Sequence, residues 1–280
     1  MERYVLRARA VDQPGIIHKL TGGIASTGGN ILDSAQHCDE DSGQLSVRVE
    51  FESGADSEDI RTELVDRLAQ FDPIIELRKV KDKRRALIMV SKLDHCLDDL
   101  LYRYRRGELP IEIALVVSNH EDLRNVVEAA GLPFHHIPVT AETKPAAEQK
   151  LATLVNESRT DFIVLARYMQ ILSDDFSAKF AGRIINIHHS FLPSFKGAKP
   201  YHQARQRGVK LIGATAHYVT ADLDEGPIIE QDVVRVNHRS SADNLVVIGR
   251  DVERKVLSEA VRLHADDRVF LSGNHTVILG

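Results

Sequence analysis

The segment IINIHHSFLP, residues 184–193, decides how most of this chain is interpreted. It begins with apolar residues typical of a buried strand and then places Asn186, His188 and His189 where that strand should end. Side chains alternate between the two faces of a strand, so Asn186 and His188 are expected side by side on one face. Three nitrogen-bearing side chains at a strand end indicate a binding or catalytic site, because ligands of open α/β sheets bind at the carboxyl ends of the strands.

The surrounding sequence predicts an α/β sheet to which this strand belongs. ALIMVS (86–91) is a continuous apolar run of the kind expected for a strand covered on both faces. Apolar strands and helix-forming stretches then alternate as far as residue 188. This alternation predicts a doubly wound, mostly parallel, Rossmann-like sheet with right-handed crossovers.

The first part of the chain has a different pattern. Alternating and helical stretches follow one another in the order βαββαβ within residues 1–80, which is the ferredoxin-like arrangement. Ser57 is expected to cap the second of its helices. The charged stretch KDKRR (81–85) then separates this module from the second sheet. We therefore expect two domains, 1–80 and 86–280.

Composition excludes several classes of function. The net charge of −5 is spread over interspersed acidic and basic residues, which argues against a nucleic-acid or membrane partner. The two cysteines, Cys38 and Cys96, are too far apart in the chain for a CxxC site and are expected to be small buried hydrophobes. Neither a signal peptide nor an apolar membrane span is evident, so a cytoplasmic location is expected.

Three chemistries could use the polar strand end. Metal binding lacks an HExxH motif or a tight ligand cluster, and a serine nucleophile lacks the GxSxG elbow, so no metal site is expected. Polarisation of a carbonyl by an amide N–H and an imidazole fits Asn186 and His188 best. Such a histidine needs a carboxylate partner, and the loop of ADLDEGPIIEQ (221–231) offers Asp222, Asp224 and Glu225. A lone loop aspartate more often caps a turn.

Four motifs together resemble the formyltransferase fold that uses 10-formyltetrahydrofolate. They are NIH (186–188), SFLP (190–193), GATAHYVT (213–220) and LDEGP (223–227), and the similarity extends over about residues 86–275. The resemblance implies that Asn186, His188 and Asp224 are the catalytic residues and that 10-formyltetrahydrofolate is the substrate, with no other cofactor. It also implies folate binding by the segment LARYMQIL, in particular Leu165, Arg167, Tyr168, Met169, Gln170 and Ile171.

Within this fold, the loop SKLDHCLDD (91–99) contains no glycine and three aspartates, which disfavours a phosphorylated acceptor. The whole arrangement resembles the formyltetrahydrofolate deformylase family, in which water accepts the formyl group and the released formate supplies purine synthesis. A formyltransferase acting on an unphosphorylated amine and a non-catalytic sensor are the alternatives. His217 is expected to orient the catalytic residues, and His189 to anchor the loop.

The first 80 residues resemble the ACT family of small-molecule-sensing domains. The resemblance rests on the run DQPGI (12–16) and on GGNI (28–31). It implies a homo-oligomer and an amino-acid effector bound near Asp12, Gly15 and Asn30. The glycines could instead serve only turns with unusual backbone angles.

Overall fold

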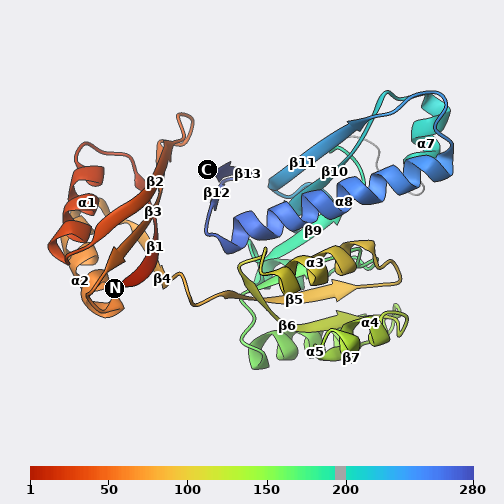
Figure 1. Cartoon of the computed structure of the whole chain (residues 1–280), viewed down its shortest axis with the longest axis horizontal. Helices are drawn as coiled ribbons and strands as arrows, with labels where there is room; N and C mark the ends of the chain where they lie inside the picture. The colour runs from red at the N-terminus through yellow and green to blue at the C-terminus, as the bar shows by residue number, and fades with distance from the viewer. Residues whose placement is uncertain (193–199) are drawn as a thin grey trace. The chain divides into compact units, whose positions relative to one another are not determined.

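The computed structural model describes residues 1–192 and 200–280, which form two compact units (Figure 1). The first unit contains residues 1–83 and 266–280, and the second contains residues 84–265. The predicted division, 1–80 and 86–280, therefore needs a correction at the C-terminus, because residues 266–280 group with the first unit. None of the helices in the described ranges is long and apolar enough to cross a membrane.

The first unit has the predicted ferredoxin-like fold. Its main elements are β1 (Glu2–Val11), α1 (Ile16–Ser26), β2 (Asn30–Cys38), β3 (Gln44–Ser53), α2 (Ser57–Leu68), the 3₁₀ turn η1 (Ala69–Phe71) and β4 (Ile74–Lys79). The four strands form an antiparallel sheet in the order β2-β3-β1-β4. Apolar residues such as Leu6, Val49 and Leu64 are fully buried in its core. The cap of α2 is Asp56 rather than Ser57, because the Asp56 carboxylate accepts from the backbone N–H of Glu58.

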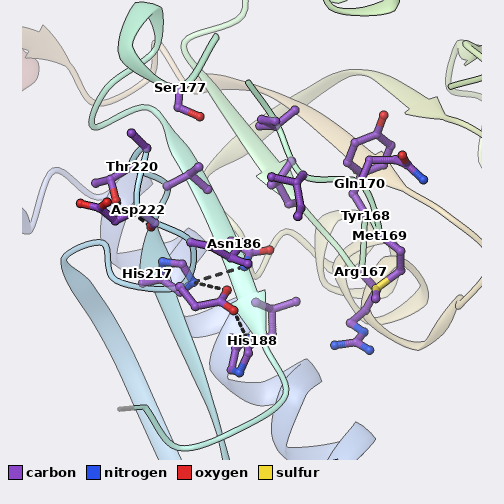
Figure 2. Close-up of a pocket in the computed structure, with 18 of the residues that line it drawn as sticks. Arg167, Tyr168, Met169, Gln170, Ser177, Asn186, His188, His217, Thr220 and Asp222 are labelled. Atoms are coloured by element: carbon purple, nitrogen blue, oxygen red, sulfur yellow. Dashed lines mark hydrogen bonds and ion pairs between the residues drawn. The ribbon is translucent and has the colours of Figure 1, made fainter. Parts of the chain in front are cut away.

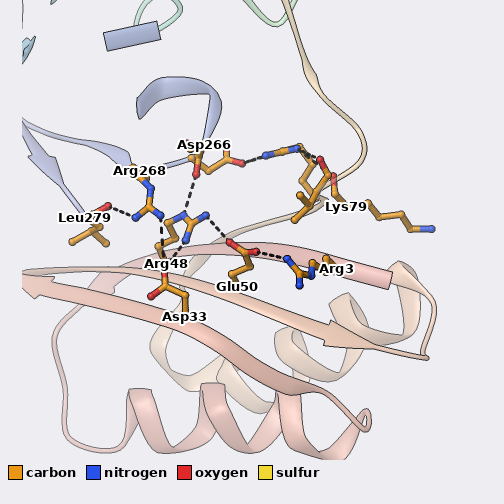
Figure 3. Close-up of polar contacts among 11 residues, drawn as sticks. Arg3, Asp33, Arg48, Glu50, Lys79, Asp266, Arg268 and Leu279 are labelled. Carbon is orange, nitrogen blue, oxygen red and sulfur yellow. Dashed lines mark hydrogen bonds and ion pairs between the residues drawn. The ribbon is translucent and has the colours of Figure 1, made fainter. Parts of the chain in front are cut away.

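The last residues of the chain belong to this unit through polar contacts. They form the hairpin of β12 (Val269–Ser272) and β13 (His275–Ile278). Figure 3 shows Arg48, whose side chain is 3% exposed, donating to the backbone oxygen of Asp266 at 3.0 Å. Arg48 alternates with the core residue Val49 on β3, so the hairpin lies on the sheet face opposite the helices. The local sequence pattern cannot predict contacts between residues so far apart in the chain.

The second unit is an α/β sheet with helices on its faces. Its elements are β5 (Arg84–Val90), α3 (His95–Arg106), β6 (Ile111–Ser118), α4 (Arg124–Ala129), β7 (Phe134–His136), α5 (Lys144–Glu157), β8 (Phe162–Leu165), α6 (Asp174–Lys179), β9 (Ile184–His188), α7 (Pro200–Arg207), β10 (Leu211–Tyr218), β11 (Ile228–Arg235) and α8 (Ala242–Ala265).

The seven strands lie in the order β11-β10-β9-β8-β5-β6-β7. Strands β5 to β9 are parallel, whereas β10 is antiparallel to both β9 and β11, so the predicted mostly parallel sheet is confirmed. The long helix α8 packs against β9, β10 and β11 (Figure 1). The polar strand end with Asn186 and His188 is the carboxyl end of β9, beside that of β8.

Candidate active site

Strand β9 places Asn186 and His188 on one face, as their spacing predicts. The antiparallel pairing with β10 sets His217 opposite Asn186. Nδ1 of His217 lies 2.9 Å from the backbone oxygen of Tyr218, which fixes the ring proton on Nδ1. Nε2 of His217 then accepts from the amide Nδ2 of Asn186 at 3.2 Å. One amide N–H of Asn186 is thereby used, and the second makes no hydrogen bond with residues 1–192 or 200–280, so it can donate to a ligand.

Asp224 reaches His188 from the loop between β10 and β11. Its Oδ2 lies 3.2 Å from Nδ1 of His188, and its Oδ1 lies 3.7 Å from Nε2 of His217. The hydrogen bond from His188 holds the pKa of the Asp224 carboxyl well below its usual range, although partial burial opposes it. The carboxylate is therefore ionised at neutral pH.

The proton arrangement of His188 follows from that contact. Because Nδ1 faces an ionised carboxylate, Nδ1 carries the proton and Nε2 is the basic nitrogen. Nε2 is buried and has no hydrogen-bond partner within residues 1–192 and 200–280. The side chain of His188 is 8% exposed. A buried basic nitrogen beside an open pocket is suited to accept a proton from a bound molecule.

The pocket beside these residues has a volume of about 280 Å³ (Figure 2). Asn186, His188, His217 and Asp224 line one part of it. The segment after β8 lines another part with every residue predicted for folate binding, namely Leu165, Arg167, Tyr168, Met169, Gln170 and Ile171. The loop after β10 adds Val219, Thr220, Ala221, Asp222 and Leu223, of which the sequence singled out only Asp222, as a candidate carboxylate.

The segment after β8 is held from the neighbouring strand ends. Ser91, after β5, accepts a hydrogen bond from the backbone N–H of Met169 at 2.9 Å and donates to Oδ1 of Asn119 at 2.7 Å. Ser91 is 2% exposed, so this link is shielded from water. Met169 is 58% exposed and can contact a ligand. Burial raises the pKa of Tyr168 to about 12 and keeps its phenol neutral.

Comparisons with known proteins agree with this geometry. A formyl transferase family model matches residues 84–261, and an ACT domain model matches residues 4–69. A formyltetrahydrofolate deformylase from Corynebacterium sp. (strain P-1) is 51% identical over 99% of this chain and 98% of its own length. The crystal structure of the Burkholderia mallei formyltetrahydrofolate deformylase superposes with a TM-score of 0.97 at 43% identity, covering 100% of both chains.

The chain belongs to the formyltetrahydrofolate deformylase family.

Formyl-transferring enzymes are similar to only part of this chain. The glycinamide ribonucleotide transformylase 1 of Symbiobacterium toebii superposes with a TM-score of 0.65 at 32% identity, covering 71% of this chain and 95% of that one. Both kinds of protein therefore share one catalytic fold. The fold alone does not decide whether water or an amine accepts the formyl group.

A second polar cluster in this deformylase family member was not predicted. Glu253 of α8 is 2% exposed, and its carboxylate lies 2.8 Å from Nε2 of His95 and accepts from the hydroxyl of Tyr201 at 2.8 Å. Nε of Arg167 lies 3.4 Å from the same carboxylate. A signal does exist in the sequence, because Glu253 occupies an otherwise apolar face of α8 between Val252 and Val256.

Two residues of this cluster, together with Cys96, form a group of three potential metal ligands among the described residues. His95, Cys96 and Glu253 each offer an atom within 4.8 Å of the others, a combination that Zn²⁺ can bind. Glu253 is already engaged by Tyr201 and by the positive charge of Arg167, which opposes a second cation. Burial also raises the pKa of Cys96 far above its usual range and keeps the thiol protonated. We interpret the cluster as a hydrogen-bonded ionic network.

The residues predicted for effector binding lie in the first unit of this deformylase family member. Asp12 follows β1, Gly15 precedes α1 and Asn30 begins β2, and all three are exposed. Gly15 has φ of 95°, a left-handed conformation that glycine adopts readily, so the turn alone explains a glycine there. Effector binding at these three residues stays a prediction.

Proposed function

We propose that this protein hydrolyses 10-formyltetrahydrofolate to formate and tetrahydrofolate. The observation that carries the proposal is the convergence of Asn186, His188 and Asp224 on one pocket that the folate-binding segment also lines. The names of its relatives support the same substrate. The reaction uses side chains that can polarise a carbonyl and accept a proton, and it requires no covalent intermediate.

In the proposed mechanism the formyl oxygen faces the free N–H of Asn186. Nε2 of His188 takes a proton from water as the water oxygen attacks the formyl carbon. The negative charge that develops on the formyl oxygen is stabilised by the Asn186 amide, and Asp224 stabilises the imidazolium that forms on His188. The bond from the formyl carbon to N10 then breaks, and His188 returns the proton to N10.

This scheme assigns different roles to the pair His188 and Asp224, which the sequence left open. Nδ1 of His188 faces Asp224 at 3.2 Å, and its Nε2 has no partner among the described residues. Asp224 is ionised, and its carboxylate already accepts a hydrogen bond from Nδ1 of His188. His188 is therefore proposed as the base. Asp224 is proposed to orient the His188 ring and to stabilise its protonated form.

The test measures formate released from 10-formyltetrahydrofolate in buffer alone and with an added amine such as glycinamide. A hydrolase releases formate in stoichiometric amounts under both conditions, whereas a transferase releases little formate in either case and forms the N-formyl derivative of the amine when the amine is present. Asn186→Ala should lower kcat by about 10²–10³-fold and change KM less, because its hydrogen bond strengthens as the oxyanion forms. An effect on KM alone would contradict the role given to Asn186.

We also propose that the first unit binds an amino acid and joins copies of the chain. The ACT domain model that matches residues 4–69 supports the first part. The exposed β2, which is an edge strand of its sheet, supports the second part, because an edge strand offers unpaired backbone groups to another chain. Light scattering and formate release with glycine and methionine added in turn would test both parts.

A further inference from the structure

The ionic network around Glu253 requires an explanation beyond stability. Removing a carboxylate and a guanidinium from water costs several kcal/mol per ion, and apolar replacements of similar volume are often equally stable. Glu253 is nevertheless 2% exposed, and the Nε side of Arg167 lies 3.4 Å from its carboxylate. Burial alone would raise the pKa of Glu253. The pKa nevertheless lies below its ordinary value, because hydrogen bonds from His95 and Tyr201 and the charge of Arg167 stabilise the carboxylate. The network therefore holds Arg167 in place.

Arg167 transmits that constraint to His189. Its Nη1 lies 2.8 Å from Nδ1 of His189. A guanidinium can only donate, so Nδ1 of His189 accepts and the ring proton lies on Nε2. Burial, followed by the charges of Arg167 and His188, lowers the pKa of His189 to about 4, so the ring is neutral at physiological pH. The backbone of Arg167 has φ of 65°, a conformation that costs energy in a residue other than glycine.

The neutral ring of His189 lies against His188. The two ring centroids are 4.9 Å apart, and the planes are inclined by 20°, which is a stacked arrangement. Asp224 holds one edge of the His188 ring, and His189 covers one of its faces. Together these contacts fix the direction of Nε2, which the Asp224 contact alone would leave free to swing.

We propose that His189 is a positioning residue for His188, held in a single tautomer and plane by Arg167 and the network around Glu253. The inference rests on the proposed function, in which Nε2 of His188 exchanges protons with water and N10. A neutral neighbour serves this role because it stacks on the ring without repelling the imidazolium that forms during turnover. A positively charged residue at the same place would raise the energy of that imidazolium.

Two substitutions separate the ring contact from the hydrogen bond. His189→Asn keeps an oxygen near the position of Nδ1 but removes the ring, whereas His189→Phe keeps the ring and removes the acceptor. We expect His189→Asn to lower kcat by about 10–100-fold, because a misplacement of about 1 Å can cost about 10²-fold. His189→Phe should retain more activity than His189→Asn, and KM should change by less than about threefold in both. His238→Phe, at an exposed histidine, is the matched control.

A spectroscopic measurement on the unmodified enzyme makes the test independent of folding defects. Nitrogen-15 NMR of the labelled protein, assigned by comparison with His189→Asn, should show at pH 7 a neutral His189 protonated on Nε2. A protonated ring, or a proton on Nδ1, would overturn the inference, as would normal kcat in His189→Asn or an effect on KM alone. Failure of the unmodified enzyme to release formate from 10-formyltetrahydrofolate would show instead that the proposed function itself is wrong.

Discussion

At the residue scale, each hydrogen bond in the site sets the proton position of the next group. The carbonyl of Tyr218 fixes the proton of His217, and His217 in turn orients the amide of Asn186. Asp224 sets the proton of His188 in the same way. The site is thus organised before any substrate binds, which is how enzymes stabilise developing charge without reorganising at the moment of reaction.

The first prediction concerns the charge of Asp224. Asp224→Asn keeps the size of the side chain but cannot stabilise a positive His188, so kcat should fall by about 10²–10⁴-fold. Because the pKa of Asp224 is lowered, the carboxylate is ionised at any pH above about 4, and its protonation cannot cause a loss of activity between pH 6 and 8. Formate release across that range measures both effects, and an unchanged thermal unfolding temperature confirms that the variant is folded.

The second prediction concerns the stability contributed by His189. Its pKa is lowered to about 4 in the folded protein from an ordinary value of 6.5, so between these values the unfolded chain binds more protons. Stability therefore rises with pH across this window and is lost as the pH falls from 7 to 5, by about 2 kcal/mol for this residue. Urea unfolding of His189→Asn should show a correspondingly smaller loss between pH 7 and pH 5. Equal losses in both proteins would contradict the neutral buried ring.

At the element scale, the loop between β10 and β11 depends on one glycine. A Cβ atom on Gly226 would collide with the backbone oxygen of Tyr218 and approach the ring of His217. The loop can therefore fold back on the end of β10 only with glycine at this position, and this brings Asp224, with φ of 59°, to His188. The motif LDEGP is thus a structural unit in which Gly226 positions the aspartate that precedes it.

The third prediction follows from that close approach. Gly226→Ala should displace the loop and lower kcat by about 10²-fold, a loss typical of a catalytic group moved by about 1 Å. Gly54→Ala is the matched control, because a Cβ there meets nothing within 4 Å and the φ of Gly54 is not positive. A Gly226→Ala variant with unimpaired formate release would show that the loop tolerates the shift.

Local pattern predicts the elements but only part of the site. The alternation of β9 predicted that Asn186 and His188 share a face, and the strand–helix order predicted the sheet. Asp224 could be assigned only through the family resemblance, because the sequence offered three acidic residues in one loop. Residues 193–199, which follow the strand β9 motif, lie outside the described residues. The contact between Arg167 and Glu253 joins residues that are 86 positions apart in the chain. Periodicity carries no information on such pairings.

At the scale of the whole molecule, the two units are not two successive segments of the chain. Helix α8 belongs to the second unit, and the chain that follows it belongs to the first. Within the first unit, Arg78 pairs with Asp267 at 2.6 Å, and Ser272 donates to Asp39 at 2.7 Å. Phe270 is fully buried and lies 4.5 Å from the guanidinium of Arg7. Residues 266–280 are therefore part of the core of the first unit.

The last prediction concerns how the protein can be divided. Deleting residues 1–80 alone leaves the hairpin β12–β13 without its sheet and exposes Phe270, so the fragment 81–280 should aggregate. The fragment 84–265 contains the complete second sheet and every residue of the proposed site, so it should be monodisperse and should release formate without responding to amino acids. Light scattering and formate release on both fragments make the comparison. If 81–280 is as soluble and stable as 84–265, residues 266–280 do not depend on the first unit.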